Sequence, residues 1–260
     1  MCIRDRCGYL GRHPQIRPGR RKEVMHFDRL ASFERGEDHY MRSFPIRKPW
    51  GPRGARSIDA TPEYLFREGV AARIHEFEPS AKILVCLREP ISRAFSHWNM
   101  FRQIFEKNFD EMWSGFMDDA DPAERTALWS LFHREQFPNF EEAVREDIEA
   151  FQSSSNCSEP SFVRRGIYQP QVKAYLDQFG PENVLTIGSR DLRDSTAATL
   201  GSIVHFLRLD PFTFETDDLR PVHARAYDLA PSQDVIDTLT DFYRPHNTQL
   251  EDLLGGLPNW

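Results

Sequence analysis

The strongest constraint on the fold of this chain is a strand, a turn and a helix that follow one another in residues 82–105. KILVCL (82–87) is a continuous apolar run, which is typical of a strand buried on both faces of a parallel sheet. REP follows the run, and ISRAFSHWNMFRQIF then repeats its apolar residues at helical spacing. Pro90 stands where the first residue of a helix can be proline. The segment therefore predicts a strand–turn–helix unit.

A second apolar run, NVLTIG (183–188), lies between two further helical patterns. GIYQPQVKAYLDQF precedes this run, and DSTAATLGSIVHFLRL (194–209) follows it. Residues 230–254 predict two closing helical segments that are broken at Pro245. Because strands that alternate with helices form parallel sheets covered on both sides, we predict the α/β class.

Residues 106–160 differ from the rest of the chain. They are acidic, carry scattered aromatic residues and have no strand pattern, so we predict a helical insertion. Its aromatic side chains either pack in a core or stack on sugar rings, and core packing is the favoured interpretation. The residues concerned are Trp113, Phe116, Trp129 and Phe132.

Composition sets further limits. The 260 residues are 40% hydrophobic, which suffices for one domain, and no run approaches the ~18 apolar residues of a membrane span. The four cysteines form no CxxC pair and no zinc-site spacing, which predicts a reducing compartment and no metal. The net charge is −7, yet residues 1–61 are basic. Such a basic segment is either a solvated surface or faces an anionic partner.

The turn after the first predicted strand is the best candidate for an anion site. Arg88 ends the strand and can donate a forked pair of hydrogen bonds to a phosphate. The helix from Pro90 should offer unpaired backbone N–H groups, and Ser96 adds a hydroxyl. From these residues alone, an equal alternative is that Arg88 pairs with a carboxylate and that Ser96 faces solvent.

The pattern R-x-P-x-x-R-x-x-S after an apolar strand resembles the 3′-phosphate-binding segment of the sulfotransferase superfamily, in its heparan-sulfate-type and related bacterial branch. This resemblance implies a P-loop-like fold and a sulfate donor, 3′-phosphoadenosine 5′-phosphosulfate (PAPS). It implies that Arg88 and Ser96 hold the 3′-phosphate of PAPS. Arg93 also matches the pattern, and we expect it to support the helix or to pair locally.

A second segment, HPQIRPGRRKEVMHFD (13–28), resembles the family's HPxI…KExxFFD stretch. The resemblance implies that Glu23 is the general base that takes the proton from the acceptor, with Lys22 beside it as a catalytic cation. Without the resemblance, a surface Lys-Glu pair would be preferred. His26 stands where the family usually has phenylalanine, and it is the next candidate for the base.

Three later stretches follow the family's order. DATPEYL (59–65) resembles its TPxYL motif, and residues 164–192 resemble a further stretch in which Arg190 replaces the usual acid. His223 and Arg225 lie where a basic loop closes over the cofactor's phosphate, which implies that Arg225 binds the cofactor. We therefore expect residues 7–260 to form a single sulfotransferase domain, with 106–160 inserted.

The sequence lacks the family's first strand and its K-x-G-T-S/T loop, whose backbone N–H groups cradle the phosphosulfate. MCIRDR at residues 1–6 resembles the translation of a sequencing adapter. We interpret the chain as a metagenomic fragment with an artefact at its start. We expect it to be inactive as written, with an open trough beside strand 82–87.

The resulting hypothesis is a sulfotransferase. It would move a sulfuryl group from PAPS to a hydroxyl or amine of a small-molecule or oligosaccharide acceptor, with a carbohydrate favoured, and would leave 3′-phosphoadenosine 5′-phosphate. We expect no metal, no nucleic-acid partner and no membrane segment. The expected location is cytoplasmic, or the Golgi lumen if a lost N-terminus carried an anchor.

An alternative from another class is a non-catalytic nucleotide- or polyanion-binding module, which would tolerate loss of Glu23. A P-loop kinase is disfavoured because no GxxxxGK[ST] motif is present.

Overall fold

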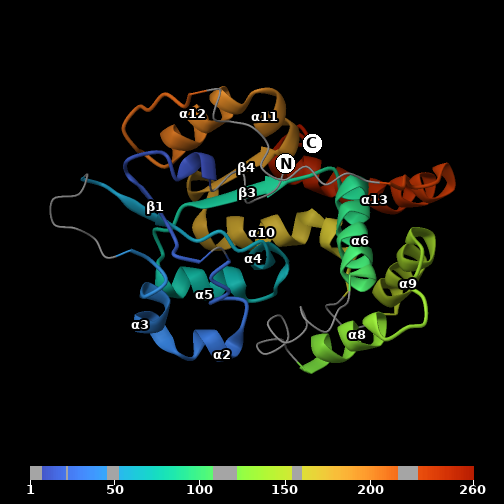
Figure 1. The fold of residues 1–260 in the computed structure, drawn as a ribbon. Coiled ribbons are helices and arrows are strands. Elements are labelled where there is room, and N and C mark those ends of the chain that lie inside the picture. The colour runs from blue at the N-terminus through green and yellow to red at the C-terminus, as the bar shows by residue number, and fades with distance from the viewer. Residues whose placement is uncertain (1–7, 22, 46–52, 108–121, 154–159, 216–227) are drawn as a thin grey trace. The chain divides into compact units, whose positions relative to one another are not determined.

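The computed structural model of the 260-residue chain forms two compact units (Figure 1). Unit 1 comprises residues 1–87, 171–226 and 258–260, and unit 2 comprises residues 88–170 and 227–257. The structure describes residues 8–21, 23–45, 53–107, 122–153, 160–215 and 228–260.

Unit 1 contains short strands and helices from three stretches of the chain. Its elements are β1 (Ile16–Pro18), α2 (Leu30–Phe33), α3 (Gly36–Met41), β2 (Arg56–Ile58), α4 (Glu63–Phe66), α5 (Val70–Phe77), β3 (Ile83–Leu87), the 3₁₀ turn η2 (Pro181–Asn183), β4 (Val184–Gly188), α11 (Ser189–Asp194) and α12 (Thr196–Phe206). Helix α10 (Tyr168–Phe179) begins in unit 2 and continues in unit 1.

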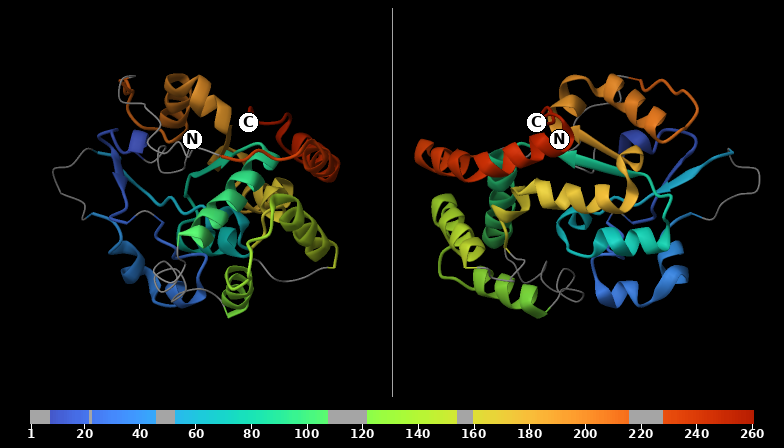
Figure 2. Two further views of the ribbon diagram at one scale, coloured as in Figure 1. Left: turned by 45° about the vertical axis from the view of Figure 1, so that its right-hand side comes forward. Right: turned by 180° about the vertical axis from the view of Figure 1, so that it is seen from behind.

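The two predicted apolar strands pair with each other. β3 and β4 are parallel, with Ile83 opposite Val184 and Leu87 opposite Gly188. Helices α11 and α12 lie on one side of this pair and α10 lies on the other, in every view of Figures 1 and 2. The α/β class with parallel strands covered on both faces is therefore confirmed.

One edge of β3 is filled by another strand, and the trough expected beside strand 82–87 stays a prediction. β4 occupies this edge of β3 along all five paired positions, from Ile83 to Leu87. Backbone N–H and C=O groups at a buried strand edge need partners, and β4 supplies them here. Residues 1–6, which resemble a translated sequencing adapter, lie outside the described residues.

Two buried polar residues of the HPQI stretch tie unit 1 together. His13 is 1% exposed and its Nε2 lies 2.9 Å from the carbonyl oxygen of Asp210. Gln15 donates to the carbonyl of Arg53 (2.8 Å) and accepts from the amide of Asp210 (2.8 Å). Since buried polar groups need such partners, HPQI has a structural role that connects three distant segments.

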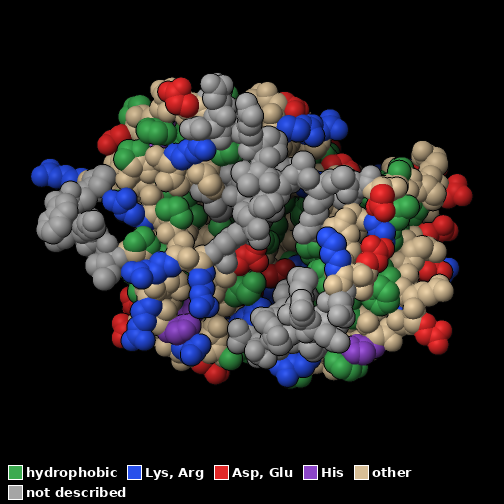
Figure 3. Space-filling view, in the orientation of Figure 1, with side chains coloured by type: hydrophobic (Ala, Val, Ile, Leu, Met, Phe, Trp, Pro, Cys, Tyr) green, Lys and Arg blue, Asp and Glu red, His purple; other side chains and the backbone are tan. Residues whose placement is uncertain are grey.

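The basic character of residues 1–61 is found at the surface of unit 1. On the face shown in Figure 3, Lys and Arg side chains recur over β1 and α3. Arg17 and Arg29 are half-buried, and the exposed arginines of this stretch are Arg12, Arg20, Arg21, Arg35, Arg42, Arg53 and Arg56. Both interpretations of this basic segment, solvated surface and anion-facing surface, remain consistent with that exposure.

Unit 2 is helical in its described residues. It contains α6 (Pro90–Glu106), α8 (Pro122–Phe132), α9 (Phe140–Gln152), the 3₁₀ turn η1 (Arg164–Gly166) and α13 (Gln233–Leu254). Helices α8 and α9 fall within the predicted insertion, and a capping box between Asn139 and Glu142 starts α9. Among the described residues, none of the helices combines the length and the hydropathy needed to cross a bilayer.

The predicted break at Pro245 is wrong. Helix α13 continues from Gln233 to Leu254 with Pro245 inside it. Proline removes one backbone hydrogen bond and disfavours a helix interior. The buried side chains of Tyr243 and Leu250, on either side of the proline, hold both halves against the unit.

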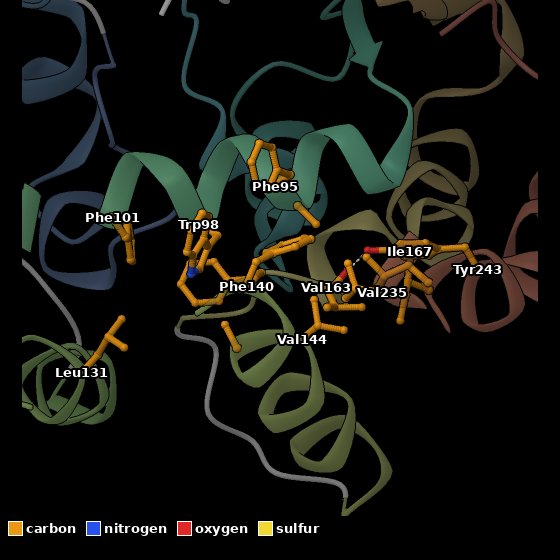
Figure 4. Close-up of a cluster of buried hydrophobic side chains, with 14 of the residues drawn as sticks. Phe95, Trp98, Phe101, Leu131, Phe140, Val144, Val163, Ile167, Val235 and Tyr243 are labelled. Carbon is orange, nitrogen blue, oxygen red and sulfur yellow. Dashed lines mark hydrogen bonds between the residues drawn. The ribbon is translucent and has the colours of Figure 1, made fainter. Parts of the chain in front are cut away.

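Aromatic packing forms the core of unit 2 (Figure 4). Phe95 and Trp98 of α6 lie against Phe140 of α9, with ring centroids 5.1 and 5.5 Å from it. The Tyr243 hydroxyl donates to the carbonyl of Val163 at 2.7 Å, as the dashed line in Figure 4 shows. This core joins α6, α9 and α13.

The aromatic residues of the insertion have different roles. Phe132 is 9% exposed and belongs to the core, in agreement with the core-packing interpretation. Trp129 is 50% exposed and stacks on His133, with ring centroids 3.4 Å apart. Trp113 and Phe116 lie outside the described residues.

We predict that Leu239→Ala destabilises unit 2 by about 2–5 kcal/mol, because Leu239 is fully buried and the truncation leaves a cavity. Urea unfolding followed by tryptophan fluorescence measures the change. Thr238→Ala, at an exposed position of the same helix, is the control and should change stability by about 0.5 kcal/mol or less. Equal unfolding midpoints for the two variants would contradict the assigned core.

Candidate functional site

The first turn of α6 is capped by the chain's own carboxylate. Glu89 accepts hydrogen bonds from the amides of Ile91 (2.8 Å) and Ser92 (2.6 Å), and its carbonyl accepts from the amide of Arg93. A carboxylate is favoured there by the helix dipole. The expectation that unpaired N–H groups of this helix face an anion is therefore wrong.

Arg88 lies along the start of α6. Its Nε donates to the Ser92 hydroxyl at 3.0 Å, and the Tyr168 hydroxyl donates to the Arg88 carbonyl at 2.8 Å. Burial raises the pKa of Tyr168 to about 12, so that this hydroxyl keeps its proton. The arginine is held at both its backbone and its side chain.

Ser92 and Ser96 extend the same face of the helix. Residues four apart on a helix are neighbours, so Ser92 and Ser96 share one face of α6, and Arg88, which precedes the helix, reaches this face through its bond to Ser92. All three side chains are half-buried. Arg88 forms no ion pair with a carboxylate of the described ranges, which leaves its guanidinium suited to an external anion.

Arg93 points into unit 2 instead. Its guanidinium donates to the carbonyl of Phe162, and its charge lies close to Tyr243. Local pairing was expected for Arg93, and the structure confirms it. The nearby His97 ring contacts Phe101 and Phe162 edge-on. Burial, and then the charges of Arg165 and Arg93, hold the pKa of His97 well below its usual value, so this ring is neutral.

The candidate base lies in unit 1, in a segment with unusual backbone conformation. Glu23 (φ 64°) and Met25 (φ 54°) both adopt left-handed conformations, which cost a non-glycine residue about 1–3 kcal/mol. The amide of Met25 donates to the Thr61 hydroxyl at 3.3 Å, and the amide of His26 donates to the Tyr64 hydroxyl at 3.0 Å. The DATPEYL stretch thus holds the KEVMHFD stretch.

His26 is enclosed by aromatic rings. It is 2% exposed, stacks on Tyr40 (4.8 Å between centroids) and meets Phe27 edge-on (4.9 Å). Burial, with the neighbouring His39, lowers its pKa. The ring fills the place of the family's phenylalanine as an aromatic packing residue, and this enclosure disfavours it as the alternative base.

Asp28 closes the segment in a site that disfavours its charge. Burial, with a smaller contribution from the charge of Glu63, raises its pKa to about 6, against the opposing effect of Arg29 and Arg67. Its Oδ1 is buried without a hydrogen-bond partner in the part of the chain that the structure describes. Asp28 therefore keeps its proton to a higher pH than an exposed aspartate does.

The predicted site residues fall in both units. Glu23 belongs to unit 1, whereas Arg88 and Ser96 belong to unit 2, so that a cleft shared by Glu23 and Arg88 stays a prediction. Lys22, His223 and Arg225 lie outside the described residues. Arg190, which replaces the family's acid, is exposed, and its amide donates to the carbonyl of Asn259.

Several residues of the site were not singled out from the sequence. Ser92 stands four residues after Arg88, a helical spacing that could have indicated it. Glu89 directly precedes a proline at a helix start, which is the usual place of a cap. Asp59 and Tyr64 contact the base segment across more than thirty residues, and no local pattern signals that. Within the described ranges, no group of three or more His, Cys, Asp or Glu residues is placed to hold a metal.

Comparison with known proteins finds sulfotransferases both by sequence and by structure. No family model matches the chain. It is 24% identical over 208 residues to carbohydrate sulfotransferase 15 of Rattus norvegicus, covering 76% of this chain and 33% of that protein. It is 25% identical over 285 residues to the human bifunctional heparan sulfate N-deacetylase/N-sulfotransferase 2, covering 97% and 28% respectively. The chain thus spans about a third of these relatives' length.

A solved structure extends the similarity to the fold. The sulfotransferase from Alicyclobacillus acidocaldarius superposes with a TM-score of 0.67 and 26% identity, covering 96% of this chain and 89% of that one. The chain is therefore a relative of the carbohydrate and heparan sulfate sulfotransferases and has a sulfotransferase fold.

We predict that Asp28→Asn stabilises the protein more at pH 7.5 than at pH 4. Because the pKa is raised to about 6 in the folded state, the folded protein binds more protons than the unfolded one between about pH 4 and 6. Wild-type stability therefore falls as the pH rises through this window, by about 1–3 kcal/mol for this group. Thermal melting at a series of pH values measures the effect.

The exposed Asp252→Asn serves as the matched control for this pH series. Its melting temperature should follow that of the wild type at every pH. If the melting temperature of Asp28→Asn differed from that of the wild type by the same amount at every pH, the raised pKa assigned to Asp28 would be wrong.

Proposed function

We propose that this protein transfers a sulfuryl group from PAPS to a hydroxyl or amine of a carbohydrate. The observation that carries the proposal is the similarity to a bacterial sulfotransferase over 96% of the chain. The names of the relatives, a carbohydrate sulfotransferase and a heparan sulfate N-sulfotransferase, support a sugar as the acceptor.

In this proposal, the 3′-phosphate of PAPS binds along the start of α6. Arg88 supplies the charge, and Ser96 supplies a hydroxyl from the helix. The Ser92 hydroxyl donates to the Glu89 carbonyl and accepts from Arg88, so it holds the arginine in place. Arg225 is proposed to add a second cation from its loop. Glu89 remains occupied by the helix amides, so that its charge is offset by the helix dipole.

The proposed reaction is an in-line transfer. Glu23 accepts the proton of the acceptor hydroxyl or amine as that oxygen or nitrogen attacks sulfur. The bond between sulfur and the bridging phosphate oxygen breaks, and 3′-phosphoadenosine 5′-phosphate leaves with the electron pair. Lys22 is proposed to offset negative charge beside the reacting atoms. As in phosphoryl transfer, positioning and charge stabilisation supply the catalysis.

The test of this function is sulfuryl transfer from PAPS to a desulfated heparan-type glycan. No lysine of this sequence starts a K-x-G-T-S/T loop, so we propose that the chain by itself transfers little. A chain extended at its start by the strand and K-x-G-T-S/T loop of a sulfotransferase of known structure should transfer readily. Nucleotide binding without transfer by the extended chain would instead favour a non-catalytic nucleotide-binding module.

We predict that Arg88→Ala weakens binding of adenosine 3′,5′-bisphosphate by about 10- to 100-fold, because hydrogen bonds to charged groups contribute about 1.5–3 kcal/mol. Isothermal titration calorimetry measures the affinity. Adenosine 5′-monophosphate, which lacks the 3′-phosphate, should bind both forms equally. Arg134→Ala, which removes another arginine of unit 2, is the control. An unchanged affinity in Arg88→Ala would remove Arg88 from the site.

We predict that Glu23→Gln lowers turnover of the extended chain by about 10²–10⁴-fold, the usual contribution of a positioned general base. Its affinity for adenosine 3′,5′-bisphosphate should stay within about twofold, because Glu23 acts on the acceptor. Full turnover in Glu23→Gln would move the base to another residue.

A further inference from the structure

We propose that Asp59 is a positioning residue that holds the Glu23–His26 turn and thereby aims Glu23. The catalytic meaning of this inference rests on the proposed function of Glu23 as the base. The structural part rests on the contacts of Asp59 alone. Asp59 directly follows β2 and lies in unit 1 with the turn.

Four donors converge on the Asp59 carboxylate. The Tyr64 hydroxyl donates to Oδ2 at 2.7 Å, and the Thr61 hydroxyl donates to Oδ1 at 2.8 Å. The Tyr40 hydroxyl and the backbone N–H of Val24 also donate to this carboxylate. The donors come from α3, α4, the loop before α4 and the base segment. A carboxylate with this many donors is a strong and directional junction.

The positions of the hydroxyl hydrogens determine which group donates and which accepts in each hydrogen bond of this network. Because the Tyr64 and Thr61 hydroxyls give their hydrogens to Asp59, their oxygens are left as acceptors. The Thr61 oxygen accepts from the amide of Met25, and the Tyr64 oxygen accepts from the amide of His26. Asp59 therefore orients two hydroxyls toward backbone groups that it does not touch.

Three consecutive amides of the turn are held in this way. Val24 is bound by Asp59 itself, Met25 through Thr61 and His26 through Tyr64. These amides directly follow Glu23 and include the left-handed Met25. Left-handed residues persist where the surroundings over-determine them, and this network provides that restraint.

The network is itself anchored to a long helix. The Tyr175 hydroxyl of α10 donates to the carbonyl of Tyr64 at 2.6 Å, and Tyr64 is 9% exposed. The Tyr64 ring also meets Phe27 edge-on, with centroids 5.7 Å apart. Tyr64 is thus fixed at its backbone and its ring, so that the hydroxyl orientation is the part that Asp59 controls.

Hydrogen–deuterium exchange on this chain tests the structural part. Asp59→Asn keeps the side-chain shape but places an N–H₂ group against the donors. The amides of Val24, Met25 and His26 should then exchange at least tenfold faster, while those of α12 stay unchanged. Two further variants separate the contributions: Thr61→Val should release the amide of Met25, and Tyr64→Phe should release the amides of His26 and Phe27.

Asp252→Asn is the control for exchange, because it makes the same substitution at an exposed carboxylate outside the Asp59 contacts. The Thr61→Val and Tyr64→Phe variants keep the proposal testable if Asp59→Asn does not fold. Unchanged exchange of the three amides in a folded Asp59→Asn, or of the amides named for the two other variants, would overturn the proposal.

Kinetics of the upstream-extended chain test the catalytic part. Asp59→Asn should lower kcat at least tenfold with an unchanged KM for PAPS, and should shift the pH at which kcat rises. If exchange increases as stated but Glu23→Gln retains full turnover, the proposed role of Glu23 is wrong while Asp59 still holds the turn. If Glu23→Gln is inactive and Asp59→Asn has wild-type kcat and pH profile, the positioning role is wrong.

Discussion

The parallel pairing of β3 with β4 is the constraint on which the rest of unit 1 depends. Five residues of each strand pair in register, and the pairing ends at Leu87 and Gly188. A helix follows each strand end, and a carboxylate caps each one: Glu89 at α6 and Asp191 at α11. In open α/β sheets, ligands bind beyond the carboxyl ends of the strands, which is where Arg88 stands.

The second organising interaction is the Asp59 carboxylate, which links the base segment to α3 and α4. The two left-handed residues of that segment would not persist in an isolated peptide, and their conformation is imposed by acceptors from distant residues. The proposed anion-binding residues and the proposed base are thus positioned by different kinds of interaction. The anion side follows from a strand-to-helix turn, and the base side follows from a buried polar network.

The sequence predicted those features that depend on local patterns. Continuous apolar runs identified β3 and β4, and helical spacing identified α6, α10 and α12. Pro245 was misinterpreted because proline's local preference for ending helices was overcome by tertiary packing of α13. The Glu89 cap and the Asp59 network were not foreseen. The cap competes with an external anion for the same amides, and the network joins residues more than thirty positions apart.

A crystal structure of this chain with adenosine 3′,5′-bisphosphate tests the central claim most directly. The account predicts the 3′-phosphate within hydrogen-bond distance of the Arg88 guanidinium and the Ser96 hydroxyl, with Glu89 still capping α6. A nucleotide whose 3′-phosphate contacts neither residue, while Arg88 keeps its bond to Ser92, would contradict the account.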